Sequence, residues 1–104
     1  MTAYFLSKAA EQDLREIAVY TKRKWGVNQL NKYRRELKNR FEEIALNEVH
    51  HKQYSANLPY VYVNKVGAHF IFYHALNDEP PMIIGVIHEA RDIVSHLTAR
   101  GFVS

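Results

Sequence analysis

The segment that decides the fold is residues 6–26, LSKAAEQDLREIAVYTKRKWG, because its apolar residues recur at helical spacing. Steps of three or four residues place side chains on one face of an α-helix. The residues at these steps are Ala10, Leu14, Ile17, Ala18, Thr21 and Trp25. Ser7 suits the N-cap, and Gly26 suits the left-handed turn that follows a helix. The segment therefore predicts an amphipathic helix, and we expect Trp25 to anchor its end against a β-sheet.

A second amphipathic helix is predicted over residues 28–46, almost directly after the first. Its apolar residues again repeat at helical spacing between charged positions. They are Leu30, Tyr33, Leu37, Phe41, Ile44 and Ala45. A connection this short forces two helices into an antiparallel hairpin. The apolar faces of the hairpin then need a further surface to cover them, which we expect to be a sheet.

Three β-strands are predicted after the helices, at residues 60–66, 68–76 and 82–88. These segments are rich in aromatic and β-branched residues and are bounded by turn signals. The middle strand alternates two sets of large side chains: Phe70 and Phe72 share one face, whereas Ile71 lies on the other. Both faces of this strand are therefore expected to be covered.

The remaining segments complete an α+β fold. Residues 2–6 predict a short edge strand, residues 47–59 a loop, and residues 93–99 a short C-terminal helix. The side chains of this helix that we expect to dock on the sheet are Ile93, Val94 and Leu97. Helices and strands that do not alternate along the chain are typical of this class. We expect one domain over residues 1–104, in which an N-terminal strand and an α-helical hairpin pack on an antiparallel β-sheet.

The composition limits the possible functions. The chain has 104 residues, of which 47% are hydrophobic and 24% are charged. It has no signal-peptide pattern and no apolar run of about 20 residues that could span a membrane. It also has no cysteine, so disulfides, thiolate metal sites and thiol nucleophiles are excluded. We therefore expect a cytoplasmic protein without a membrane partner.

Basic residues are concentrated in residues 22–40, which contain eight Lys and Arg residues and a single acid, Glu36. The segment carries a net charge of +7 and the rest of the chain −4, since the whole chain carries +3. Such a field attracts nucleic acid or an acidic protein segment, although a solvated helical surface has the same composition. The residues expected to contact an acidic partner are Lys22, Lys24, Arg34, Arg35 and Lys38.

Catalytic and metal-binding patterns are sparse. The six histidines include no pair spaced for one metal ion, and the four glycines are too scattered for a phosphate-binding loop, so no metal or cofactor is predicted. The residues on neighbouring strands that could transfer protons in metal-free RNA cleavage are His69, Tyr73 and His88. Between residues 41 and 90, however, only Lys52 and Lys65 could bind a phosphate. The sequence therefore predicts no catalytic site.

Four short motifs resemble the ParE family of bacterial toxins, within the wider ParE/RelE superfamily. The first helix carries the string A-x-x-D-L-x-x-I-x-x-Y-T-x-x-x-W-G, and the second begins with Gln29 and Tyr33. Residues 67–73, GAHFIFY, are similar to the family's G-x-H-x-I-F-Y strand. Residues 86–88, VIH, are followed by Asp92 and Ile93. The resemblance extends over nearly the whole chain.

The resemblance implies a RelE/ParE-like fold and the toxin role in a type II toxin–antitoxin system. ParE toxins as a family inhibit DNA gyrase by binding rather than by catalysis, and ParD-type antitoxins neutralise them. It implies a ParD-like antitoxin as partner, in a heterotetramer or larger complex, and we expect acidic residues of this antitoxin to meet the cations of residues 22–40. It also implies no sequence-specific nucleic-acid binding by the toxin alone. The residues expected to affect toxicity or to contact the target are Tyr62, Lys65, His69, Tyr73, His88, Arg91 and Arg100.

Two alternatives stand beside a gyrase inhibitor. RelE-type relatives cut mRNA on the ribosome with Arg and Lys residues borne on strands, and a family member without this activity could bind an antitoxin without being toxic. Many relatives carry Arg where this chain has Tyr62 and Gly85. The missing cations argue against RNA cleavage. Because these arginines are frequent in ParE toxins as well, their absence also keeps a non-toxic antitoxin-binding protein among the alternatives.

Overall fold

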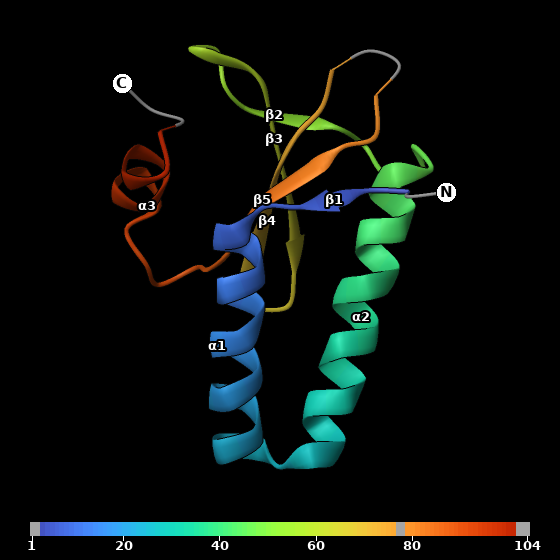
Figure 1. Ribbon diagram of the computed structural model, residues 1–104, viewed down its shortest axis with the longest axis vertical. Coiled ribbons are helices and arrows are strands. Elements are labelled where there is room, and N and C mark those ends of the chain that lie inside the picture. Colours follow the sequence, from blue (N-terminus) through green and yellow to red (C-terminus); the bar gives the residue numbers. More distant parts are fainter. Residues whose placement is uncertain (1–2, 77–78, 102–104) are drawn as a thin grey trace.

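The computed structural model describes residues 3–76 and 79–101. The elements follow the order β1-α1-α2-β2-β3-β4-β5-α3 (Figure 1). Helices α1 and α2 pack on the sheet near one end of the hairpin and extend well past the sheet at the other. Within the described ranges, no helix has both the length and the apolar character needed to cross a membrane. The predicted α+β class is confirmed.

Helix α1 spans Lys8–Trp25 and has the predicted ends. The Ser7 hydroxyl accepts a hydrogen bond from the backbone N–H of Ala10 at 3.0 Å. Gly26 has a φ of +91°, a conformation that residues with a Cβ rarely adopt. Capping and backbone freedom therefore set the two ends of α1, as the sequence predicts.

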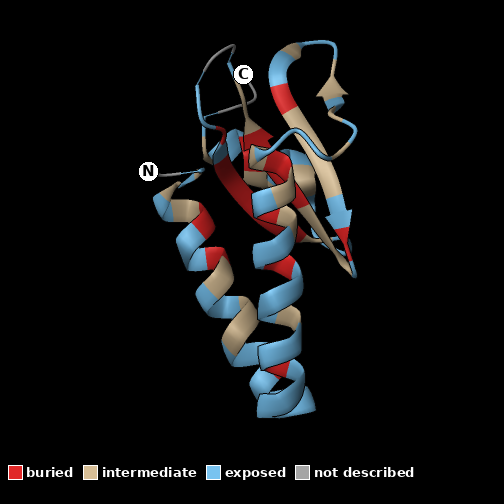
Figure 2. Ribbon diagram, turned by 90° about the vertical axis from the view of Figure 1, so that its right-hand side faces the viewer, coloured by how far each residue is buried: buried red, intermediate tan, exposed pale blue. Residues whose placement is uncertain are grey.

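The last turn of α1 differs from the prediction. Trp25 is 64% exposed, so the expectation that it anchors the helix against the sheet is wrong. Because the hairpin extends beyond the sheet, its last turns have no strand to pack on, and Figure 2 shows this far half to be largely exposed. The apolar face of α1 is thus buried only along the part of the helix that the sheet or α2 covers.

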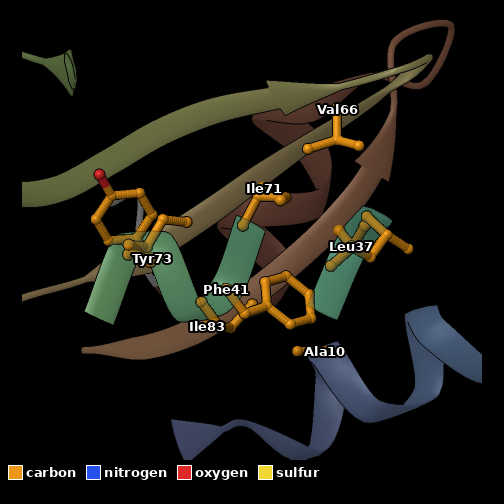
Figure 3. Close-up of a cluster of buried hydrophobic side chains, with 9 residues drawn as sticks. Ala10, Leu37, Phe41, Val66, Ile71, Tyr73 and Ile83 are labelled. Carbon is orange, nitrogen blue, oxygen red and sulfur yellow. The ribbon is translucent and has the colours of Figure 1, made fainter. Parts of the chain in front are cut away.

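Helix α2 spans Val27–Ala45 and runs antiparallel to α1, as predicted from the short connection. Its buried residues are Leu30, Leu37, Phe41 and Ile44. Three of these, Leu37, Phe41 and Ile44, join Ala10 in a hydrophobic core between the hairpin and the sheet (Figure 3). Tyr4 covers this core from the N-terminal side, with its ring edge-on to Phe41 at 5.5 Å between centroids.

The sheet has the strand order β1-β5-β4-β3-β2. The strands are β1 (Phe5–Leu6), β2 (Lys52–Ser55), β3 (Leu58–Val66), β4 (His69–His74) and β5 (Met82–His88). Strands β2 to β5 pair antiparallel, whereas β1 pairs parallel to β5, which corrects the expectation of a purely antiparallel sheet. No hairpin turn joins β1 to β5, so no turn dictates their relative direction. Residue 2 of the predicted edge strand lies outside the described residues.

The loop expected at residues 47–59 is partly wrong, because β2 lies within it and β3 begins at Leu58. Strand β2 has four residues at the edge of the sheet, and its register with β3 shifts between Gln53 and Ser55. Two of the four are exposed, so the strand does not bury an alternating set of side chains. A short, irregular edge strand therefore leaves no period-two pattern in the sequence.

Strand β4 is central and is covered on both faces, as predicted. Ile71 and Tyr73 belong to the core beneath the hairpin, whereas Phe72 lies in a second cluster on the opposite face. Phe70 packs against this second cluster, which also contains Ile84 of β5. The alternation read from the sequence is thus the alternation of the two cores.

Helix α3 spans Ile93–Ala99, the predicted range. Asp92 caps it, with its carboxylate accepting from the backbone N–H of Ser95 at 3.2 Å. Leu97 is fully buried and Ile93 packs on the second cluster. Val94 is exposed, so the expectation that it docks on the sheet is wrong. A seven-residue helix that lies on one face brings only every third or fourth side chain to the sheet.

Candidate functional site

An apolar groove of about 540 Å³ lies between α1 and α2. Apolar residues from both helices line it, including Leu14, Ala18 and Leu37. The cations that also line it, all of them exposed, are Arg15, Arg34 and Lys38. An apolar floor with a cationic rim suits an amphipathic peptide segment whose polar side is acidic.

The structure divides the five predicted partner-binding cations. Arg34 and Lys38 line the groove, whereas Lys22 and Lys24 lie in the last turn of α1, at the far end of the hairpin. Arg35 is exposed on α2 and does not line the groove. Among the described residues, none of the five forms an ion pair. Their charge is therefore left for solvent or a partner.

A second pocket, of about 300 Å³, lies between α1, the end of β5 and α3, and we call it the histidine pocket. Its polar lining includes His69, His88, His96, Arg91, Glu16 and Tyr20. His69 and His88 are directly opposite in the β4–β5 ladder, and their rings meet edge-on at 5.2 Å between centroids. Three predicted target-contact residues, His69, His88 and Arg91, therefore share one pocket.

Hydrogen bonding sets the protonation of His69. The Tyr33 hydroxyl donates its only proton to the Val66 carbonyl at 2.9 Å. Nδ1 of His69, 2.7 Å from the same hydroxyl oxygen, must then be the donor to it. Burial, followed by the neighbouring His88, lowers the pKa of His69. The surroundings of His69 therefore favour the neutral ring with its proton on Nδ1.

Tyr73 lies apart from these histidines. It is fully buried, and its hydroxyl is hydrogen-bonded to Nδ1 of His51 at 2.6 Å, while Nε2 of His51 donates to the side-chain oxygen of Asn47 at 2.8 Å. Burial, together with the nearby Tyr62, raises the pKa of Tyr73 to about 12. Tyr62 stacks on the Tyr73 ring at 5.6 Å. The three residues considered for RNA cleavage thus do not form one acid–base site, and His51 is a partner that the sequence did not single out.

Arg100, another predicted target-contact residue, is held inside the fold. Its guanidinium forms a bidentate ion pair with Asp13 of α1 at 2.8 and 2.9 Å, and the two side chains are 15% and 11% exposed. The Asp13 carboxylate also accepts from the backbone N–H of Val86 at 2.9 Å, and the guanidinium donates to the Ile84 carbonyl at 3.0 Å. Strand β1 pairs only with the first two residues of β5. Beyond the end of β1, the ion pair therefore supplies hydrogen-bond partners for the Ile84 carbonyl and the Val86 N–H of β5.

Gly85 provides the space for this guanidinium. A Cβ at this position would lie 2.5 Å from Nη1 of Arg100. Two features of the sequence indicate this ion pair: an acid on the apolar face of α1 and a glycine inside a strand. Asp13 was nevertheless missed, because its partner is 87 residues away along the chain.

The cation of β3, Lys65, already has a partner. Lys65 pairs with Glu89 at 2.7 Å and lies over the Phe70 ring at 5.4 Å. The hydrogen bond and charge of Lys65 lower the pKa of Glu89. No cluster of His, Asp or Glu within residues 3–76 and 79–101 is arranged to hold a metal ion. The sheet therefore offers two adjacent histidines but few cations to bind a phosphate.

Comparison with known proteins agrees with this architecture. A family model described as ParE toxin of type II toxin-antitoxin system, parDE, matches residues 4–93. The chain is 33% identical over 100 residues to Toxin ParE of Escherichia coli, covering 96% of this chain and 97% of that protein. It is 35% identical over 98 residues to Toxin ParE1 of Caulobacter vibrioides, covering 93% and 99% of the two chains.

A solved structure agrees as well at the level of the fold. It is described as the chromosomal ParDE TA system from P. aeruginosa, and it matches with a TM-score of 0.64. The match covers 84% of this chain and 98% of that chain at 13% sequence identity. The family model and the relatives extend over the hairpin and the whole sheet. The chain therefore belongs to the ParE toxin family of type II toxin–antitoxin systems.

Proposed function

We propose that this chain inhibits DNA gyrase by binding it, and that a ParD-like antitoxin neutralises it from the groove between α1 and α2. The observation that carries the antitoxin part is the groove, with its apolar floor and the cations Arg15, Arg34 and Lys38. An amphipathic segment with acidic residues beside its apolar anchors would bury the floor and pair the cations. A segment of this kind is flexible alone and becomes ordered on binding.

The chemistry of the sheet supports inhibition by binding rather than RNA cleavage. Cleavage requires cations that stabilise charge on the phosphate, and loss of one such donor typically costs about 10²–10³ in rate. Lys52 and Lys65 are the only Lys or Arg residues in the five strands, and Lys65 is paired with Glu89. Arg100 reaches the sheet from beyond α3, but Asp13 neutralises it.

The test is a pair of assays on the purified full-length chain. The chain should inhibit supercoiling by gyrase and increase the amount of cleaved DNA, and prior addition of the antitoxin should restore supercoiling. A ribosome-dependent assay run beside it should show no cleavage of mRNA. Light scattering of the toxin–antitoxin complex should give a mass of four chains or more.

Two results would contradict the proposal. Cleavage of mRNA that is lost in His88→Ala would identify a ribonuclease that uses the histidine pocket. Tight antitoxin binding without any effect on gyrase would identify a non-toxic family member.

A further inference from the structure

The far end of the helical hairpin presents an aromatic and cationic surface that the fold does not use. Its residues, which we call the hairpin tip, are Tyr20, Lys22, Arg23, Lys24, Trp25 and Val27. All six are exposed, and none belongs to either core cluster or lines the groove. Figure 1 shows how far this end of the hairpin lies from the sheet. The fold therefore gives no reason for a tryptophan at this position.

Lys24 holds the two aromatic rings of the tip together. Its ammonium lies 5.6 Å from the centroid of the Tyr20 ring and 5.5 Å from that of Trp25. It also donates to the Tyr20 hydroxyl at 3.1 Å. Such contacts order side chains before a partner arrives, which reduces the entropy lost on binding. Trp, Tyr and Arg are the residues most enriched among those that dominate protein–protein affinity.

The charge around the tip fits an acidic partner. Residues 19–35 contain six Lys and Arg residues and no acid. All six cations are exposed, and in the described part of the chain none of them is in an ion pair. A protein surface with acidic residues around an apolar recess would complement both the cations and the indole of Trp25.

Two residues of the tip, Tyr20 and Lys24, continue the histidine pocket rather than the groove. Tyr20 and Glu16 of α1 line that pocket, and Lys24 follows Tyr20 by one turn on the same face. The groove is lined by other positions of α1, among them Leu14 and Ala18. A target surface can therefore extend along α1 from the histidine pocket through Tyr20 and Lys24 to the Trp25 ring, which Lys24 also contacts.

We infer that the hairpin tip docks on the protein target of the toxin, with Trp25 inserted into an apolar recess of an acidic surface. This inference rests on the proposed function, because the target is the same gyrase. The antitoxin, a DNA duplex and a second copy of this chain are the other possible occupants, and the experiment separates them.

The experiment uses Trp25 as the only tryptophan of the chain. The full-length chain is prepared with 5-fluorotryptophan, which places one fluorine atom at the tip. Its ¹⁹F NMR signal is followed as unlabelled gyrase, antitoxin or a DNA duplex is added. Gyrase should shift or broaden the signal. A signal that responds only to the antitoxin, to DNA or to the concentration of the chain itself would overturn the inference and assign the tip to that partner.

A pair of variants tests the same inference by activity. Trp25→Ala should raise the concentration that inhibits supercoiling by about tenfold or more, because it removes the anchor. Leu46→Ala is the matched control, since Leu46 is also 64% exposed but lies at the opposite end of α2. The control should inhibit like the wild type, and both variants should keep their affinity for the antitoxin.

The outcomes separate this inference from the proposed function. Equal inhibition by Trp25→Ala and by the wild type would overturn the inference and leave the proposed function intact. A wild-type chain that does not inhibit gyrase would overturn the proposed function, and the assignment of the tip to gyrase with it.

Discussion

The Asp13–Arg100 ion pair and the hairpin tip are both charged, but they use their charges in opposite ways. At the ion pair, a carboxylate and a guanidinium meet at 2.8 Å with little exposure, and both also bond to the backbone of β5. At the tip, Lys22, Arg23 and Lys24 are exposed, and within the described residues no acid pairs with them. The difference separates charge that supports the fold from charge that is available to a partner.

Asp13→Ala should have the largest effect, lowering the free energy of unfolding by about 3–5 kcal/mol. The substitution leaves the guanidinium of Arg100 buried without its counter-charge, and the backbone N–H of Val86 without its acceptor. Urea denaturation followed by circular dichroism measures the change. Glu16→Ala, an exposed acid one turn later, is the control and should cost less than about 0.5 kcal/mol. Similar losses in the two variants would remove the distinction between the ion pair and surface charge.

Gly85→Ala should lower the free energy of unfolding by about 1–3 kcal/mol. The added Cβ would lie 2.5 Å from Nη1 of Arg100, so the guanidinium must shift from its position beside Asp13. In an Arg100→Ala background the same substitution should cost less, because the colliding group is absent. A double-mutant cycle should therefore give a coupling above about 0.5 kcal/mol. Additive effects of the two substitutions would show that Gly85 does not make room for Arg100.

Reversing the charge of the groove rim should slow binding of the antitoxin. The double variant Arg34→Glu and Lys38→Glu should lower the association rate by about tenfold at low ionic strength and flatten its salt dependence. Stopped-flow measurements at several salt concentrations test this. Lys22→Glu with Lys24→Glu, at the tip, is the control and should change the rate less, because neither residue lines the groove. If the salt dependence of the association rate is unchanged in the Arg34→Glu and Lys38→Glu variant, the groove rim is not part of the interface.

Trp25→Ala should have the smallest effect on stability, below about 0.5 kcal/mol. The indole is 64% exposed and belongs to neither hydrophobic cluster, so its removal opens no cavity. Thermal or urea unfolding of the variant provides the measurement. A loss of several kcal/mol, the expectation from the helical stripe alone, would show that Trp25 packs in the core after all.

The elements that the sequence predicted well are those that bury a regular pattern of side chains. Helix α3 at residues 93–99 and strand β5 at residues 82–88 have their predicted bounds. Strand β4 has its two predicted faces. The prediction failed for β2 and for the direction of β1, because a short edge strand buries no repeating set and its pairing partner is chosen at long range.

The candidate site could likewise be predicted only in part. The strand patterns of the sequence predict His69 and His88 on neighbouring strands. In the structure the two residues are paired across β4 and β5 and line one pocket. Tyr73 is on the same strand as His69, but its hydroxyl is hydrogen-bonded to His51. Tyr73 therefore does not join His69 and His88 in one site. Spacing along one strand does not say which side chains from other segments reach it.

Periodicity, capping residues and turn glycines in the sequence by themselves determined the helical hairpin, most of the strands and the short last helix, because these depend on neighbours within a few residues. The motifs also pointed to the ParE family. Only the tertiary structure decided that Arg100 is an internal partner of Asp13 and that Trp25 is exposed. The physical reason is common to both cases: pairing and burial depend on which surface faces a side chain, and for Arg100 that surface is contributed by a residue 87 positions away.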